Sequence, residues 1–318
     1  MILNFILLAI GFVFLIFGAD YLVRGASSLA RKMGVSALAI GLTIVAFGTS
    51  APELVVNIVS VIKHTPDLAI GNILGSNIAN ILLIMGAAAL FTPIILQRGS
   101  IWKEIPFSLL AAVLILILGS DLVLNQGAPS MLSRADGITL LFFFIIFLYY
   151  IFSIRKQEIP KEEKLPAHSF GISLLMTLGG LVGLVIGGKL IVDAAVDVAR
   201  AWQVSEQLIG FTIVAVGTSL PELVTTITAA IRRQPDIAVG TVVGSNIFNI
   251  FFVLGISATL APLPYSAAAL QDTWVVAVAS LLLFISMFVG KRHTLERWQG
   301  GLFVACYVGY VAFLISRG

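Results

Sequence analysis

The sequence has 318 residues, of which 59% are hydrophobic and 11% charged, and its mean hydropathy is +1.06. These values exclude a soluble globular domain and indicate a polytopic membrane protein. The formal net charge of +3 comes from Lys and Arg residues between the apolar runs, so nucleic acid is not an expected partner.

Polar and Pro- or Gly-rich breaks divide the chain into ten predicted spans, each close to the ~20 residues that a bilayer requires. In chain order they cover about residues 3–23, 37–62, 69–90, 104–121, 135–153, 170–190, 207–231, 238–260, 272–290 and 297–315. The second and seventh spans are long and are interrupted by a Gly-Thr-Ser-x-Pro-Glu segment. We therefore expect an all-α fold of ten transmembrane helices.

An internal repeat relates the two halves of the chain. Residues 41–54 recur as residues 210–223 with 11 of 14 positions identical, and the same offset of 169 aligns Gly75-Ser-Asn with Gly244-Ser-Asn. This predicts a first repeat over 1–153, a cytoplasmic linker over 154–169 and a second repeat over 170–318. Because each half has five spans, the second half should be inverted relative to the first about an axis in the membrane plane.

The basic residues predict the orientation of the spans. If both termini lie outside, the inner loops hold 14 of the 19 Lys and Arg residues, including Arg98, Lys103, Arg292 and Arg297. Cytoplasmic loops of membrane proteins carry such an excess. We expect an integral protein of the cytoplasmic membrane with both termini outside.

The repeated motif places acidic residues inside apolar spans. Pro52 and Pro221 lack an N–H group, so helical carbonyl groups before them lose their donors. An ionised group in a membrane span is costly unless it is compensated, and it is a functional-site hypothesis by default. Glu53 and Glu222 should meet near the midplane, where inverted repeats form their binding site.

An all-oxygen site with two carboxylates suits a hard cation such as Ca²⁺. Magnesium is possible, and sodium ions use the same kinds of oxygen, whereas the lack of nearby Cys and His disfavours zinc, copper and iron. Two more polar pairs with helical i, i+4 spacing are candidate ligands. The residue-based candidates are Glu53, Glu222, Thr49, Thr218, Ser50, Ser219, Ser76, Ser245, Asn80 and Asn249.

The paired Gly-Thr-Ser-x-Pro-Glu and Gly-Ser-Asn-Ile-x-Asn segments resemble the alpha repeats of the sodium/calcium exchanger family, within the calcium:cation antiporter superfamily, and its prokaryotic members in particular. The resemblance covers essentially the whole chain. It implies a secondary active antiporter, in which sodium moving down its gradient drives calcium the other way. No enzymatic activity and no cofactor are expected, and the site is compatible with a monomer in the lipid bilayer.

The resemblance also implies roles for individual residues. Residues matching Glu53 and Glu222 bind calcium in the family, with Thr49 and Thr218 as further ligands. The sodium sites add the carbonyl groups of Ala46 and Ala215 and the Ser hydroxyls. The helices matching 3–23 and 170–190 are implied to slide as the gating pair.

The sequence leaves two alternatives to sodium/calcium exchange open, a proton-driven divalent cation antiporter and a cation channel, and it argues against potassium transport. Potassium-dependent relatives have Asp where this chain has Asn249, which argues against potassium transport. The signature of cation/proton exchangers is absent, so a proton-driven divalent cation antiporter ranks second. A cation channel is the less favoured third reading.

Overall fold

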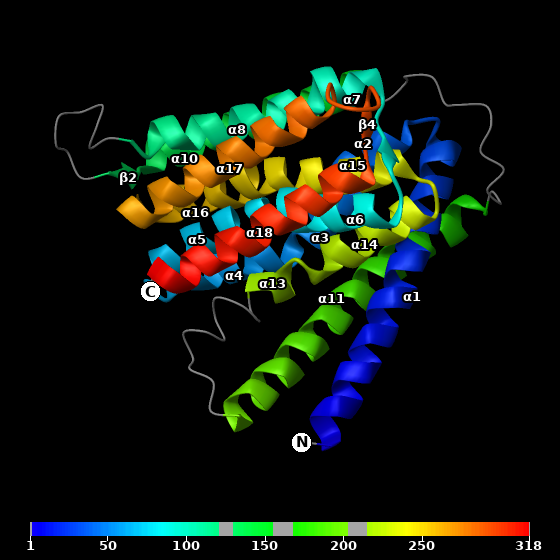
Figure 1. Ribbon diagram of the computed structural model, residues 1–318, viewed down its shortest axis with the longest axis horizontal. Coiled ribbons are helices and arrows are strands. Elements are labelled where there is room, and N and C mark those ends of the chain that lie inside the picture. Colours follow the sequence, from blue (N-terminus) through cyan, green and yellow to red (C-terminus); the bar gives the residue numbers. More distant parts are fainter. Residues whose placement is uncertain (1, 121–129, 155–167, 203–214, 318) are drawn as a thin grey trace.

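The computed structural model describes residues 2–120, 130–154, 168–202 and 215–317, and helices form almost all of this part of the chain (Figure 1). The first half contains α1 (Ile2–Met33), α2 (Ala37–Ile40), η1 (Gly41–Val45), α3 (Ala46–Thr49), α4 (Ala51–Ile62), α5 (Pro66–Ile78), η2 (Ala79–Met85), α6 (Gly86–Phe91), β1 (Ile94–Ile95), α7 (Arg98–Trp102), α8 (Glu104–Leu118), β2 (Met131–Leu132) and α10 (Arg134–Ile154). The second half contains α11 (Phe170–Ala201), α13 (Ala215–Thr218), α14 (Leu220–Ile231), α15 (Pro235–Ile247), η4 (Phe248–Leu254), α16 (Gly255–Leu260), β3 (Leu263–Pro264), α17 (Ala267–Ser286), β4 (Thr294–Leu295) and α18 (Arg297–Arg317). The η elements are π-helical.

Within these ranges, eight helices are long and apolar enough to cross a bilayer. The pair Ala37–Thr49 and Ala51–Ile62, bent by 45°, forms a ninth candidate span. The remaining predicted span, 207–231, falls partly on residues 203–214, which lie outside the described part of the chain. Its described helix α14 has 12 residues, about 18 Å of helix, which is too short to cross a bilayer alone.

Two helices extend well beyond their predicted spans. The span predicted over 3–23 is part of α1, which continues to Met33, and the span predicted over 170–190 is part of α11, which continues to Ala201. Arg24, predicted in a loop, therefore lies within α1 and pairs with Asp20 one turn earlier at 3.0 Å. Charged residues end an apolar run without ending a helix, because they can pair along its surface. Helix α1 ends where Gly34 adopts a φ of +65°.

The centre of the molecule is formed by α5 and α15 together with the segments that follow them. In the 18-residue apolar stretch of each span, 94% of the residues are buried for Pro235–Leu260 and 78% for Pro66–Phe91, against 17% for α18. Both central spans contain a π-helical segment, η2 and η4, at positions related by the repeat offset. A π-helical turn alters the backbone hydrogen bonding locally and is frequent at functional sites.

Helices α1 and α11 pack side by side and are inclined to the remaining helices (Figure 1). Glycines allow the close approach: a Cβ atom on Gly180 would lie 2.6 Å from the carbonyl oxygen of Gly18, and one on Gly187 would lie 2.8 Å from that of Gly11. These contacts show that the two helices run in opposite directions. Small residues let helix backbones pack closely in membranes, where van der Waals contact drives association.

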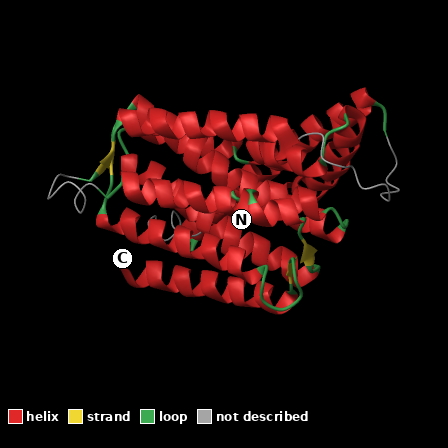
Figure 2. Ribbon diagram, turned by 90° about the horizontal axis from the view of Figure 1, so that it is seen from above, coloured by secondary structure: helices red, strands yellow, loops and turns green. Residues whose placement is uncertain are grey.

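Two short antiparallel strand pairs lie at opposite ends of the bundle (Figure 2). In one, Ile94 of β1 is paired with Leu295 of β4, and in the other, Met131 of β2 is paired with Pro264 of β3. Each pair joins a loop of the first half to a loop of the second. The connections that precede α7 and α18 are therefore held at the same end of the molecule.

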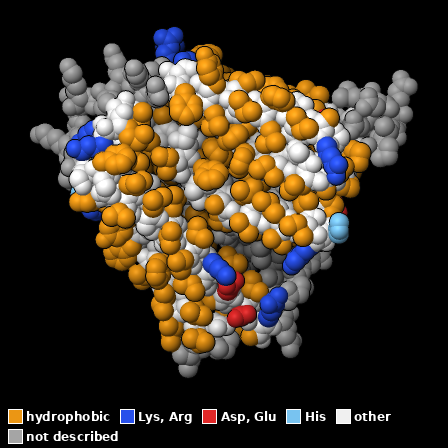
Figure 3. Space-filling model, turned by 180° about the vertical axis from the view of Figure 1, so that it is seen from behind, with side chains coloured by type: hydrophobic (Ala, Val, Ile, Leu, Met, Phe, Trp, Pro, Cys, Tyr) orange, Lys and Arg blue, Asp and Glu red, His pale blue; other side chains and the backbone are white. Residues whose placement is uncertain are grey.

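The outer surface is largely apolar (Figure 3). Large side chains such as Ile16, Tyr149 and Leu175 are more than half exposed, which in water would be unfavourable. In the view from behind, Lys, Arg, Asp and Glu side chains form small groups near the edges and in the lower part of the face. This distribution is that of an integral membrane protein whose periphery faces lipid.

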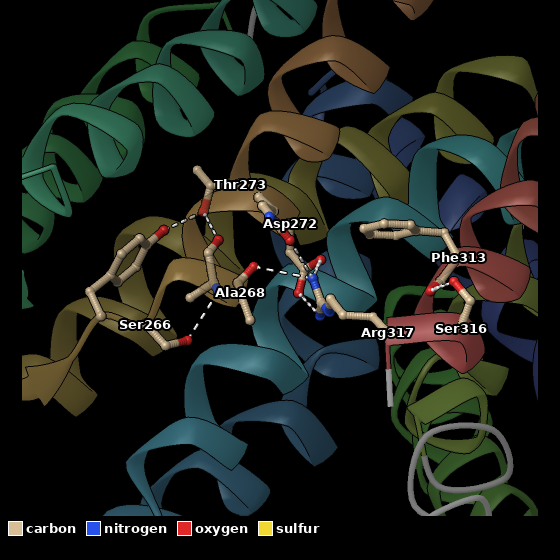
Figure 4. Close-up of polar contacts among 10 residues, drawn as sticks. Ser266, Ala268, Asp272, Thr273, Phe313, Ser316 and Arg317 are labelled. Carbon is tan, nitrogen blue, oxygen red and sulfur yellow. Dashed lines mark hydrogen bonds and ion pairs between the residues drawn. The ribbon is translucent and has the colours of Figure 1, made fainter.

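An ion pair joins the start of α17 to the end of α18 (Figure 4). The two terminal guanidinium nitrogens of Arg317, Nη1 and Nη2, donate to the carboxylate of Asp272 at 3.0 Å, and Nη1 also reaches the carbonyl oxygen of Ala268 at 3.5 Å. Beside it, Ser266 caps α17 by accepting a hydrogen bond from the Ala269 amide at 3.1 Å. The bidentate geometry fixes the C-terminal helix against its neighbour.

We expect Arg317→Gln to lower the free energy of unfolding by about 1–2 kcal/mol, because it leaves the Asp272 carboxylate without its positively charged partner. The cost stays below that of a fully buried pair because the side chains are 28% and 12% exposed. Thermal unfolding of the purified protein in detergent measures the effect. The control Arg134→Gln removes only an exposed hydrogen bond to Leu260 and should change stability by less than about 0.5 kcal/mol. Equal effects of the two substitutions would contradict this account.

Candidate cation-binding site

The two glutamates are placed by a break in the helix that precedes each of them. The backbone turns at Ser50, between α3 and α4, and again at Ser219, between α13 and α14, with nearly equal dihedral angles (φ −83°, ψ 5° and φ −90°, ψ 5°). A proline follows within the first turn of the new helix, where its missing N–H group costs nothing. Glu53 and Glu222 lie in these first turns and are fully buried.

Serine hydroxyl groups from both halves contact each carboxylate. Glu53 Oε1 accepts from Ser76 of its own half at 3.2 Å and lies 3.5 Å from Ser219 Oγ of the other half. The second half repeats this arrangement, since Glu222 Oε1 accepts from Ser245 at 3.3 Å and from Ser50 at 3.1 Å. The carboxyl groups also interact electrostatically with each other. The structure therefore brings both repeated motifs into one site.

Four asparagines cross the centre in two reciprocal pairs. Asn80 Nδ2 donates to Asn246 Oδ1 at 3.0 Å, and Asn249 Nδ2 donates to Asn77 Oδ1 at 3.0 Å. Asn77 thus pairs with Asn249, and Asn80 pairs with Asn246. Residue numbers rise along one central span as they fall along the other, so the two spans run in opposite directions. Asn246 therefore orients Asn80, and Asn77 orients Asn249. The amide nitrogens of Asn80 and Asn249 are occupied by these hydrogen bonds, whereas their side-chain oxygens have no donor among the described residues.

The site has four buried oxygens without a hydrogen-bond donor among the described residues. They are Glu53 Oε2, Glu222 Oε2, Asn80 Oδ1 and Asn249 Oδ1. A buried acceptor that is left unpaired costs roughly 1–3 kcal/mol, and more when it is charged. A bound cation removes this cost, since it contacts several oxygens at once.

The other predicted ligands differ in the contacts that the structure gives them. Thr49 Oγ1 donates to the carbonyl of Val45 at 3.1 Å and lies 3.5 Å from Ser245 Oγ. The Ala46 carbonyl, an expected sodium ligand, accepts from the Ser50 amide at 3.0 Å. Thr218 ends α13 and Ala215 begins it. Ser219 Oγ also donates to Ser76 Oγ at 3.2 Å, which links the two halves again.

Sequence reasoning missed a polar cluster next to Glu53. Asn72 Nδ2 donates to Asn57 Oδ1 at 2.8 Å and approaches the carbonyl oxygen of Glu53 at 3.4 Å. Asn57 is fully buried and donates to the carbonyl of Ala69 at 3.1 Å. The signal was available, since Asn57 lies four residues after Glu53 on the same helical face. At the repeat-related positions the second half has Thr residues, so the two halves differ here.

The chemistry of the site is that of oxygen donors. Across the described ranges, no group of three or more His, Cys, Asp or Glu side chains gathers that could hold a metal ion by itself. Two carboxylates, two free amide oxygens and several hydroxyl groups match the ligands of hard cations rather than those of zinc or copper. Both glutamates are fully buried, so bulk solvent does not reach them in this conformation.

Comparison with known sequences identifies a family over nearly the whole chain. The family described as sodium/calcium exchanger protein matches residues 3–153 and 172–316. The chain is 38% identical over 280 residues to the putative antiporter CaxA of Alkalimonas amylolytica, with 85% of each chain covered. It is 34% identical over 303 residues to the sodium/calcium exchanger MaX1 of Methanosarcina acetivorans, with 84% of this chain and 85% of the relative covered.

Comparison with solved structures agrees with this family. The fold is similar to that of the sodium-calcium exchanger NCX_Mj, with a TM-score of 0.85 and 35% sequence identity. The similarity covers 98% of both chains.

Proposed function

The chain belongs to the sodium/calcium exchanger family, and from this premise we propose that it exchanges sodium for calcium across the cytoplasmic membrane by alternating access. The observation that carries the proposal is the set of four unpartnered oxygens, one carboxylate and one amide from each half, at the centre of the bundle. Their two negative charges match one calcium ion, or sodium ions taken in its place.

The proposed ligands are those that the repeat brings together. Calcium is bound by the carboxylates of Glu53 and Glu222, with the hydroxyl groups of Thr49 and Thr218. Sodium ions use the same carboxylates with further oxygens from both halves. These further ligands are the carbonyls of Ala46 and Ala215, the hydroxyls of Ser50, Ser219, Ser76 and Ser245, and the amide oxygens of Asn80 and Asn249.

We further propose ten membrane spans in two inverted halves with both termini outside. The opposite directions of α5 and α15 support the inversion, because the helices have equivalent places in the repeat. The two strand pairs are compatible with the orientation, since each joins loops that are expected on one side of the membrane.

Charge compensation couples the ions in this mechanism. Two carboxylates buried close together repel each other and lose their hydration, so the empty site is unfavourable. Calcium or sodium relieves both costs. The protein changes between its two states, each of which opens the site to one side of the membrane, only when a bound ion compensates the charge. The pair α1 and α11 is the moving element, since it packs along its own length and is inclined to the rest of the bundle.

A flux assay with the purified protein in sealed liposomes tests the exchange. We expect calcium uptake into sodium-loaded vesicles to exceed that into choline-loaded vesicles by at least about tenfold, a difference of about 1.4 kcal/mol in barrier height. External potassium should have no effect, because Asn249 supplies no third carboxylate.

Two outcomes would contradict the proposal. Uptake that follows an imposed pH gradient without sodium would make the protein a proton-driven divalent cation antiporter. Calcium flux that needs no counter-ion would make it a channel.

A further inference from the structure

A second polar site lies far from the glutamates, at the end of the bundle where β1 and β4 pair. A cavity of about 240 Å³ is lined there by Arg98, Trp102, Phe288, Arg292 and His293. Its side chains come from α7 and from the segment between α17 and β4, so both halves of the chain contribute. The exchange mechanism uses none of these residues.

The backbone holds this cavity in a defined shape. The His293 amide donates to the carbonyl of Met287 at 3.0 Å, and the Leu96 amide donates to the carbonyl of His293 at 2.8 Å. His293 has a φ of +60°, which is uncommon for a residue other than glycine and is kept only by such surrounding contacts. The pairing of Ile95 with Thr294 then fixes the Arg292 segment beside α7.

The cavity carries positive charge without internal compensation. In the part of the chain that the structure describes, neither Arg98 nor Arg292 forms an ion pair. The nearby acidic groups have other partners: Asp236 accepts from Gln97, Glu296 accepts from the Lys291 amide and from Trp298, and Glu104 accepts from Tyr150. Two guanidinium groups around one cavity repel each other, so the arrangement is favourable when an anion lies between them.

The aromatic side chains indicate which anion this is. Trp102 is 54% exposed and packs edge-on against Phe284 and Phe288, with ring centroids 5.7 and 5.4 Å apart. These rings continue from the cavity onto the apolar surface of α17, where an acyl chain would lie. Trp is enriched at the level of lipid headgroups, and basic pockets between helices on the cytoplasmic side bind anionic headgroups.

We propose that this cavity binds the phosphate headgroup of an anionic phospholipid. Arg98 and Arg292 contact the phosphate oxygens, His293 adds a hydrogen bond, and one acyl chain lies along Trp102 and Phe288. The lipid thereby ties the start of the α7–α8 segment to the connection between α17 and α18.

Lipid binding to the purified full-length protein tests this assignment. Phosphatidylglycerol and phosphatidylcholine with the same acyl chains are titrated in detergent, and bound lipids are counted by native mass spectrometry. We expect one preferentially bound phosphatidylglycerol, and at least about a tenfold weaker affinity for it in the variant Arg98→Gln/Arg292→Gln. Arg297→Gln is the matched control, because it removes an exposed charge at the same end of the molecule without lining the cavity.

Three results would overturn the proposal. One is equal binding of the two lipids by the wild-type protein. Another is an equal loss of affinity in Arg297→Gln, which would mean general attraction to the basic surface. The third is displacement of the lipid by millimolar inorganic phosphate, which would assign the cavity to a soluble anion. Thermal unfolding of each variant without lipid separates loss of binding from loss of the fold.

Discussion

Glu53→Gln and Glu222→Gln each reduce sodium-driven calcium uptake to about 1% of the wild-type rate or less, corresponding to at least about 2.7 kcal/mol. Each glutamate has one free oxygen in the site and one oxygen held by serine hydroxyls from both halves. Replacement by glutamine keeps the shape of the side chain but removes half of the negative charge that compensates calcium. The amide nitrogen also replaces an acceptor with a donor that points at the ion. Radiotracer uptake into proteoliposomes measures the loss.

Glu104→Gln is the control for this prediction. Glu104 is also a buried glutamate, but it lies at the start of α8, where its carboxylate accepts a hydrogen bond from the Tyr150 hydroxyl. An amide oxygen can accept the same hydrogen bond, so transport should stay within about twofold of the wild-type rate. If neutralisation of Glu53 or Glu222 left sodium-driven uptake intact, the central oxygens would not be the transport site.

Gly180→Val is the substitution with the second largest expected effect. A Cβ atom at this position would lie 2.6 Å both from the carbonyl oxygen of Gly18 and from the amide nitrogen of Leu22. These are backbone atoms, so α1 and α11 must move apart to accept the side chain. We expect a loss of about 3 kcal/mol in unfolding free energy. Transport should fall by at least about tenfold even in folded protein, since the altered pair no longer slides as a close-packed unit.

The neighbouring residue provides a matched control. Gly179 is exposed, and a Cβ atom there would meet nothing within 4 Å. Gly179→Val makes the same chemical change on the adjacent, outward face of α11, and both stability and uptake should be nearly unchanged. Thermal unfolding and uptake are measured on both variants. Wild-type transport by stable Gly180→Val protein would show that close packing of α1 on α11 is not needed for the cycle.

Part of the site could be predicted because its residues carry their signal locally. Glu53 and Glu222 stand out as acids within apolar runs, and the duplicated prolines predict the helix break that the structure has at Ser50 and Ser219. The helical i, i+4 spacing of Ser76 and Asn80 places them on one face without knowledge of the fold. The membrane environment follows from composition alone.

Other features could not be predicted because they depend on contacts between distant segments. The predicted spans end before α1 and α11 do. Hydropathy indicates which residues lie in the apolar part of the bilayer, whereas a helix can continue beyond it through charged residues. The cluster around Asn57 and Asn72 was missed because polar residues in a membrane helix more often serve only to join neighbouring helices. The cavity between Arg98 and Arg292 forms only when β1 pairs with β4.

The sequence by itself determined that the protein lies in a membrane, that its two halves are repeats, and that each repeat has a glutamate within an apolar span. Hydrophobicity and repetition are properties of the chain that need no knowledge of its fold. Only the tertiary structure decided how the halves combine. It shows that the serine of one half serves the glutamate of the other, and that Asn77 and Asn246 occupy the amide nitrogens of Asn249 and Asn80. Which oxygens stay free for a cation depends on hydrogen bonds across about 170 residues of chain, and these exist only after the central helices have packed.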